Sequence, residues 1–288
     1  MPAFVFGIQI LAVGWRQSTL RKFLFACNRS MVTDLLYFLL FSSSLSGALV
    51  VFGSFGVAYW ISLAAAKELS FLSQIRLNTG IAPLNALLFF SLYNFLQHWV
   101  HRLSHTQWLW STHRLHHSAT VMNPLVGARH HVNEIVLSIL VVSAPMSMIC
   151  ISPAYLVVVG LINSFHSLIL HTDVDWNWGW FVRWVMQSPA AHRLHHSTNP
   201  DHYGKNLAVM VIWDRLFGTY FHGEIPHVEV GVTELEYDKY GPVFDHFADW
   251  WRLLRDVAAG VSALTRRVSV AQPGSETSQR ADPLSVGL

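Results

Sequence analysis

The stretch that decides the fold reads Trp99-Val-His-Arg-Leu-Ser-His105 and continues shortly afterwards with His113-Arg-Leu-His-His117. On a helix, residues three and four apart share a face, so each string projects its imidazoles toward a common point. The pattern returns as His192-Arg-Leu-His-His196. Chance does not explain two HxxHH strings in a chain with 17 His among 288 residues. The three strings predict a metal site whose catalytic ligands are His101, His105, His113, His116, His117, His192, His195 and His196.

The composition indicates that this site is held in a membrane protein. Hydrophobic residues make up 52% of the chain and charged residues only 12%, a balance typical of integral membrane proteins. The net charge is +2, and no basic run with interleaved aromatics suggests a nucleic-acid partner. Because Cys27 and Cys150 are the only cysteines, a disulfide framework and a thiolate metal site are both excluded.

Apolar segments predict an all-α fold with about four transmembrane helices. Residues 2–15 are too short to span comfortably and are interpreted as an interfacial or re-entrant start. Residues 35–61 and 81–100 are long enough to cross, and the second runs directly into His101. Residues 134–150 and 153–170 read as a hairpin broken near Pro153. Two passes return the chain to the same face, so both HxxHH strings belong to one cap, and the arginines around them place it in the cytoplasm.

The domain organisation follows from the same segments. Residues 1–80 form an N-terminal membrane region, and 81–222 form the catalytic domain, which includes the membrane hairpin 134–171. Residues 223–267 are amphipathic and rich in tryptophan, consistent with a surface helix. Residues 268–288 are rich in Ser, Gly, Pro and Gln and are predicted to be a disordered tail.

The number of histidines favours two metal ions over one. A structural zinc site is complete with four ligands, whereas the three strings alone offer eight imidazoles. Two neighbouring irons that activate dioxygen would use such a set, while apolar helices bring a lipid to them. An HExxH zinc motif is missing. A carboxylate-bridged di-iron bundle would need Glu-x-x-His pairs, and the single match, Glu224 to His227, contains Pro226 and makes a poor helix.

The order of these motifs resembles the fatty acid hydroxylase and sterol desaturase superfamily over roughly residues 94–220. The resemblance includes HxxxH, HxxHH, His171 at the close of the hairpin, the second HxxHH and Ile212-Trp-Asp-Arg-Leu-Phe-Gly-Thr219. It implies a non-haem di-iron site with an all-histidine ligand set, and O2-dependent hydroxylation or desaturation of a membrane lipid. Arg129-His-His131-Val-Asn-Glu134 is similar to the family's Arg-x-His-Pro-x-Glu element. His171 and His131 therefore join the expected metal ligands.

Several residues near the strings depart from the family pattern or support it. Val132 replaces the proline of the element, and Asn94 and His98 stand where an acidic residue and a tyrosine are usual, so the surroundings of His101 differ here. Glu134 and Asp173 are candidates to accept an N–H from a ligand imidazole. The remaining histidines are interpreted as surface, interfacial or supporting groups: His98, His130, His166, His202, His222, His227 and His246.

The predicted function is that of a membrane-bound di-iron oxygenase acting on a sterol, fatty acyl or related lipid. No haem segment, flavin motif or nucleotide fingerprint is visible, so electrons are expected from a separate electron-transfer protein or a small reductant. One alternative is a histidine-rich membrane metal transporter or metal-binding protein, whose ligands would lie near the middle of the spans. Another is a zinc-dependent lipid hydrolase. A compact length without a retention signal suggests a bacterial inner membrane.

Overall fold

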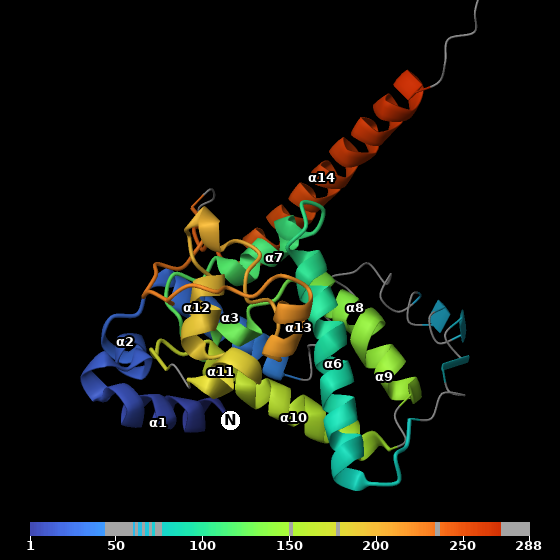
Figure 1. Cartoon of the computed structure of the whole chain (residues 1–288). Coiled ribbons are helices and arrows are strands. Elements are labelled where there is room, and N and C mark those ends of the chain that lie inside the picture. Colours follow the sequence, from blue (N-terminus) through green and yellow to red (C-terminus); the bar gives the residue numbers. More distant parts are fainter. Residues whose placement is uncertain are drawn as a thin grey trace, which may run out of the picture.

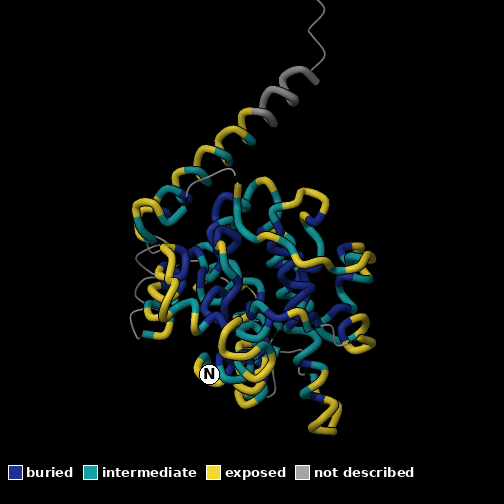
Figure 2. Tube along the Cα trace, turned by 90° about the vertical axis from the view of Figure 1, so that its left-hand side faces the viewer, coloured by how far each residue is buried: buried dark blue, intermediate teal, exposed yellow. Residues whose placement is uncertain are grey.

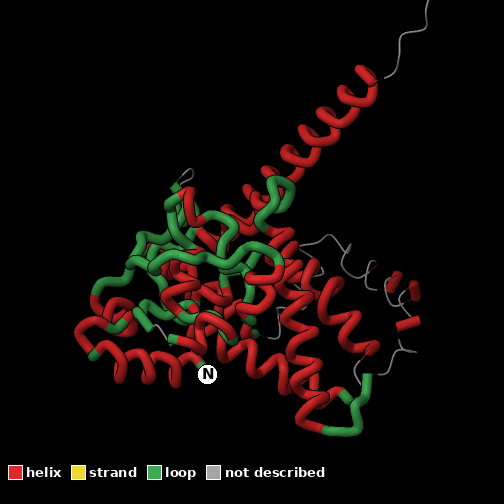
Figure 3. The backbone as a smooth tube through the Cα atoms, in the orientation of Figure 1, coloured by secondary structure: helices red, strands yellow, loops and turns green. Residues whose placement is uncertain are grey.

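The structure is a computed structural model in which the described part of the chain is helical, with loops between the helices (Figure 3). It describes residues 1–43, 60, 63–64, 67–68, 71–72, 77–149, 152–176, 179–233 and 237–271. Within these ranges there is no strand, only two isolated β-bridges. The prediction of an all-α fold is confirmed. Most of the predicted span at 35–61 lies outside the described residues, as does the tail from residue 272 onward.

The described helices follow one another as short and long segments (Figure 1). Their bounds are α1 Pro2–Val13, η1 Trp15–Gln17, α2 Thr19–Phe25, α3 Arg29–Ser42, α6 Ala82–Ser104, α7 Trp110–His117, η3 Val126–Ala128, α8 Val132–Ser138, the π-helix η4 Ile139–Ser143, α9 Ala144–Ile149, α10 Pro153–Leu170, α11 Trp180–Trp184, α12 Pro189–His195, η5 Pro200–His202, α13 Val211–Leu216 and α14 Pro242–Ala271.

Two helical segments among the described residues are long and apolar enough to cross a membrane. They are Val132–Ile149, which joins α8, η4 and α9, and Pro153–Leu170, which is α10. Both correspond to the hairpin that the sequence predicts. Only 22% and 17% of their residues are buried inside the protein, so their apolar side chains face outward as lipid-facing residues do. The pair α2 and α3 adds a third candidate, bent by 106°.

The other predicted span, 81–100, forms a helix but is less apolar than the hairpin. Helix α6 is continuous over 23 residues, yet Asn85, Asn94 and His98 are buried along it. Two helices, or three if the bent pair counts as one span, therefore meet the criteria of length and apolarity in the described chain, against about four predicted. The apolar core that joins α6 to the hairpin contains Phe89, Val100, Val142, Met146 and Val159.

The buried residues concentrate in the body of the molecule, while α14 extends away from it (Figure 2). The N-terminal half of α14 packs along α7. This helix continues to Ala271, so it runs into the region predicted to be a disordered tail. The helix exposes the apolar side chains of Phe244, Phe247 and Trp251.

A buried arginine, Arg129, forms ion pairs with an N-terminal and a C-terminal segment of the chain. Arg129 is fully buried, and its guanidinium pairs with Asp34 of α3 at 3.1 Å and with Asp238 at 2.7 Å. It also donates to the carbonyl of Leu115 on α7 and to the hydroxyl of Ser118. These bonds satisfy a charge that burial alone would make very costly.

Candidate metal centre

The candidate ligands lie at helix ends and on two short helices, because those places can direct several rings to one point. His101 lies in the last turn of α6 and His105 caps that helix. His171 caps the end of α10. The two HxxHH strings form α7 and α12. Helix α12 begins with Pro189 after Ser188, whose side chain accepts from Ala191 N, a favourable helix start.

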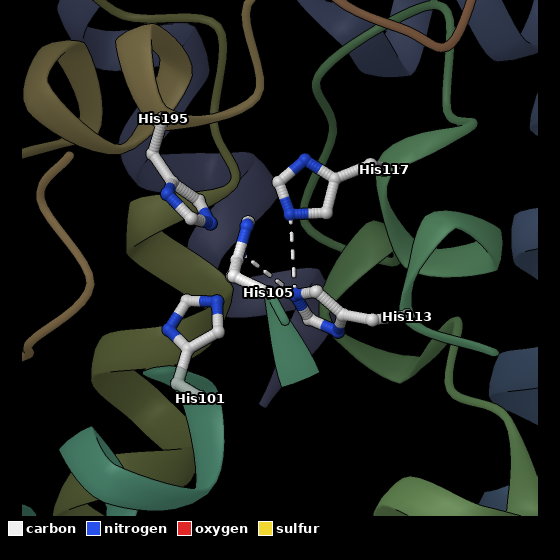
Figure 4. A group of neighbouring side chains, drawn as sticks. All are labelled: His101, His105, His113, His117 and His195. Carbon is white, nitrogen blue, oxygen red and sulfur yellow. Dashed lines mark hydrogen bonds between the residues drawn. The ribbon is translucent and has the colours of Figure 1, made fainter. Parts of the chain in front are cut away.

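Nine histidines converge into two groups. The first histidine group draws on α6, α7 and α12, and one nitrogen from each of its rings lies within 4.8 Å of the others. Figure 4 shows these five rings directed toward a common space. Its members are His101, His105, His113, His117 and His195.

The second histidine group draws on α7, α12 and the end of α10. Its four rings are all buried, and their ligand nitrogens also lie within 4.8 Å of one another. Its members are His116, His171, His192 and His196. The structure therefore divides each HxxHH string between two groups, whereas the sequence analysis expected each string to point to one place.

The nitrogen separations fit a shared metal ion. Two nitrogens bound to one metal at about 2.0–2.1 Å and separated by roughly 90–109° would lie about 2.8–3.4 Å apart. In the first group, His113 Nε2 lies 3.2 Å from both His105 Nε2 and His117 Nε2. In the second group, His171 Nε2 lies 3.3 Å from His116 Nε2 and 3.0 Å from His192 Nε2.

The outward ring nitrogens decide where the protons are. His171 Nδ1 lies 2.7 Å from the carbonyl oxygen of Ser167, and His192 Nδ1 lies 3.2 Å from Gln187 Oε1. A carbonyl oxygen only accepts, so both Nδ1 atoms must carry the proton and donate it. The two Nε2 atoms then face each other at 3.0 Å with bare lone pairs. Lone pairs at that distance repel unless a cation lies between them, which is the arrangement of a metal site.

The first group has the same orientation of its rings. His101 Nδ1 donates to the carbonyl of Leu207 at 2.7 Å, and His195 Nδ1 donates to the carbonyl of Lys205 at 2.9 Å. Their inward Nε2 atoms are buried and have no hydrogen-bond partner in the structure. Buried nitrogens without partners are costly in a site that holds nothing, so these residues fit a bound metal.

Burial keeps the ligand rings neutral, as metal binding requires. It lowers the pKa of His171 to about 4 and that of His195 to about 3. Burial, followed by repulsion from neighbouring imidazolium charges, also holds the pKa of the other rings well below their usual 6.5: His101, His105, His116, His117, His192 and His196. A neutral imidazole keeps a lone pair for a metal at neutral pH.

Glu134 is the acidic residue that orients a candidate ligand. Its carboxylate accepts from His113 Nδ1 at 2.7 Å through one oxygen and lies 2.7 Å from His130 Nδ1 through the other. A carboxylate on the outward nitrogen fixes the tautomer and strengthens the ligand. Asp173, the other candidate for this role, instead pairs with Lys22 and Arg193.

His131 is not brought to either group. Its ring caps α8, where Nδ1 accepts from Asn133 N, and it stacks on His246 with ring centres 3.9 Å apart. His166 also lies outside the groups, and its Nε2 donates to the carbonyl of Gln187. His98 is buried, and neither of its ring nitrogens has a hydrogen-bond partner.

The segment 212–219 supports the site through Asp214. Its carboxylate accepts from the backbone N–H groups of Leu207 and Ala208 and from Thr219 Oγ1. These bonds hold the loop whose Leu207 carbonyl orients His101. The sequence does not reveal the acceptors Gln187, Lys205 and Leu207, because Lys205 and Leu207 act through backbone carbonyls that any residue supplies.

A cavity of about 730 Å³ leads to the first histidine group. It is lined by α6, by the hairpin segments α8, η4 and α10, and by the η3 turn, and it reaches His101 and His113. A volume of this size suits a small-molecule ligand. None of the second group's histidines is among its lining residues.

Comparison with known proteins identifies the region that carries the site. The family model described as fatty acid hydroxylase matches residues 86–219, a range that contains all nine histidines of the two groups. Residues 86–219 are therefore similar to the fatty acid hydroxylase family. No solved structure is significantly similar to the chain.

Curated relatives of this fatty acid hydroxylase region include lipid enzymes from animals and plants. Alkylglycerol monooxygenase of Homo sapiens is 31% identical over 163 residues, covering 55% of this chain and 36% of that protein. Alkylglycerol monooxygenase of Xenopus tropicalis is 32% identical over 129 residues, covering 44% and 28% respectively. A very-long-chain aldehyde decarbonylase of Oryza sativa subsp. indica is 28% identical over 152 residues, covering 49% and 24%. The chain thus spans about a third or less of the length of these relatives.

Proposed function

We propose that the protein is a membrane-bound di-iron oxygenase that uses O2 to hydroxylate or desaturate a lipid. The observation that carries this proposal is the pair of adjacent histidine groups, one of which opens into a cavity lined by membrane-type helices. The five rings of the first group would hold one iron and the four rings of the second group would hold the other. Two bound irons would supply the reduction of dioxygen and the oxidation of a C–H bond.

The chain's own residues would position the lipid and exclude water. In hydroxylation, a lipid C–H bond, O2, two electrons and two protons give C–OH and water. In desaturation, two adjacent C–H bonds, O2, two electrons and two protons give C=C and two waters. The reductant would be external, a separate electron-transfer protein or a small reductant. The apolar hairpin would carry the lipid laterally from the bilayer to the cavity.

The names of the relatives favour an ether lipid as the first substrate to test. Alkylglycerol monooxygenases from three vertebrates match the chain at 31–32% identity. We propose that the substrate is an alkylglycerol or a related lipid, and that the histidine face is cytoplasmic in a bacterial inner membrane. The ligand histidines lie at helix ends and not in the middle of the two candidate spans, which disfavours the transporter alternative.

The test is oxidation of lipids by the full-length protein under 18O2. Protein purified in detergent should contain about two irons per chain and, with a reductant, should transfer labelled oxygen to a hydroxylated lipid or form an alkene in an O2-dependent manner. Recovery of a single zinc, with lipid turnover that needs neither iron nor O2, would replace the oxygenase with a hydrolase. Omission of the reductant is the control, because multiple turnover requires two electrons per cycle.

A further inference from the structure

The cavity beside the first histidine group carries unsatisfied polar atoms on one face of α6. Asn94 is 1% exposed, and its Nδ2 donates to the carbonyl of Phe90 at 2.8 Å. This bond identifies which atom of the amide is nitrogen, so Asn94 Oδ1 is the acceptor, and it has no hydrogen-bond partner. Asn94 lines the cavity. A buried acceptor is therefore left open beside the space where a lipid would bind.

His98 lies one helical turn further along the same face and toward His101. It is also 1% exposed and lines the cavity, and both of its ring nitrogens lack a hydrogen-bond partner. Its nearest charged oxygen, Asp214 Oδ1, is 3.9 Å from Nδ1 and therefore beyond hydrogen-bond distance. The ring is held flat against Phe217, with ring centres 5.5 Å apart. A neutral imidazole offers one donor and one acceptor.

Gln97, another polar residue that lines the cavity on α6, is satisfied within the protein. Gln97 Nε2 donates to Tyr93 Oη and to Ser138 Oγ, each at 3.2 Å. These three residues close a network that needs nothing from a ligand. The open atoms of Asn94 and His98 are thus not a general property of the cavity wall.

A bare hydrocarbon chain in the cavity would leave these atoms unpaired. A single hydroxyl group would pair with both residues, because its O–H can donate to Asn94 Oδ1 while its oxygen accepts from the N–H of His98; the acceptor nitrogen of His98 is not used by this hydroxyl. A site built to hydrogen-bond a hydroxyl rejects the analogue that lacks it far more strongly than an apolar pocket rejects an extra methylene. Since residues 94 and 98 precede residue 101 on one helix, the hydroxyl would lie about 5–10 Å along the helix axis from His101.

We propose that Asn94 and His98 form a subsite for a hydroxyl group of the lipid, which selects alcohol-bearing lipids and places a carbon near their polar end at the metal centre. This inference rests on the proposed function in that a lipid is the substrate of the cavity. It deepens that function by excluding fully apolar chains and by assigning the polar end of the lipid to the α6 wall. Phospholipid acyl chains oxidised far from any hydroxyl are not expected as substrates.

The test compares two ligands of nearly equal shape, hexadecan-1-ol and heptadecane, by displacement of a fluorescent lipid from the full-length protein without reductant and without O2. The alcohol should bind the wild type about ten- to a hundredfold more tightly than the alkane, after correction for micelle partitioning. Asn94→Leu should remove most of that ratio by weakening alcohol binding alone. Leu168→Met, which changes an apolar residue of α10 that lines the same cavity, is the control and should keep the ratio.

Several outcomes would overturn the subsite. Equal binding of the two ligands to the wild type would do so without any variant, as would an unchanged ratio in Asn94→Leu and His98→Phe. A loss of iron from Asn94→Leu with an unchanged ratio would show that Asn94 supports His101 instead. Because binding is measured without turnover, absence of lipid oxidation would reject the proposed function, while the ratio of alcohol to alkane binding would still test the subsite. An active oxygenase that binds both ligands equally would reject the subsite alone.

Discussion

His116 and His195 are exchanged between the two histidine groups. His116 belongs to α7 but lies with His192 and His196 of the α12 string, and His195 belongs to α12 but lies with His113 and His117 of α7. They occupy the same position in the two HxxHH strings. Each short helix therefore supplies two ligands four residues apart to one group and a single ligand to the other. Neither helix can shift without disturbing both groups.

Removal of the His116 or the His195 ring should weaken metal binding in both histidine groups. We expect His116→Ala and His195→Ala each to lower the iron content of the purified protein and to reduce lipid turnover at least about a hundredfold. The reason is that α7 and α12 each supply ligands to both groups, so the loss of one ligand disturbs the helix that holds ligands of the other group. Iron analysis and product formation measure this at matched protein amounts. His222→Ala, on an exposed ring, is the control. His246 is unsuitable because it stacks on His131. Full iron in both ligand variants would reject the metal assignment.

Glu134→Gln should weaken metal binding while leaving all nine rings in place. An amide cannot reproduce the charge that faces His113 Nδ1, and it can turn a donor toward that nitrogen, which disfavours the tautomer with a free Nε2. Loss of a carboxylate partner of a ligand histidine typically reduces metal affinity about ten- to a hundredfold. Competition with a chelator measures the change. Glu229→Gln, at an exposed position, should match the wild type; equal affinities for all three proteins would contradict the role of Glu134.

The metal-free protein should lose stability as the pH falls below about 6.5. Unfolded histidines take up protons below their usual pKa of 6.5, whereas His171 in the folded state does so only near pH 4 and His195 only near pH 3. Between about pH 6.5 and pH 4, the unfolded state therefore binds more protons than the folded state. The free energy of unfolding decreases as the pH is lowered, by up to about 1.4 kcal/mol per pH unit for each such ring. Chemical unfolding between pH 7.5 and 5 measures the slope. A flat profile would contradict the buried neutral rings.

Arg129→Met should destabilise the fold by about 3–5 kcal/mol, because it leaves the buried carboxylates of Asp34 and Asp238 without their counter-ion. Unfolding of the metal-free protein in detergent gives the difference without interference from ligand binding. Arg255→Met removes an exposed pair with Asp256 and should change stability by less than about 1 kcal/mol. Similar losses of stability in the two variants would mean that the buried ion pairs of Arg129 stabilise the fold no more than an exposed pair does.

Gly127→Ala should disturb the second histidine group. A Cβ at this position would lie 2.9 Å from Ser167 Oγ and 3.2 Å from His171 Nδ1, so the ring of His171 must shift from the carbonyl that orients it. We expect lower iron content and slower turnover, with the protein still inserted in the membrane. Gly160→Ala, in α10, meets nothing within 4 Å and should behave as the wild type. Normal iron in Gly127→Ala would show that His171 tolerates the displacement.

The sequence predicts those parts of the fold that depend on local spacing. The apolar runs at 134–150 and 153–170 give the two candidate spans, and the helical class is confirmed. The eight histidines of the three strings and His171 converge, because residues three and four apart on short helices share a face. The resemblance to the fatty acid hydroxylase family rests on the same strings and is confirmed for residues 86–219.

The division into two groups could not be predicted, because it depends on how α7 and α12 face each other across the site. The acceptors behind the rings were also hidden, since Ser167, Lys205 and Leu207 act through backbone carbonyls. His131 was included on a resemblance whose proline is replaced by Val132, and in the structure its ring caps α8 instead of joining the ligands.

The contacts of Arg129 show that the folded unit extends beyond the residues that match the family. The family match runs from residue 86 to 219, yet the two carboxylates that neutralise Arg129 lie at residues 34 and 238, one before the match and one after it. A fragment cut at the limits of the match would retain every metal-binding ring and leave a buried cation without either partner. A designer who transplants this histidine scaffold into another chain must therefore carry both acids along or replace the arginine with an apolar residue of similar volume.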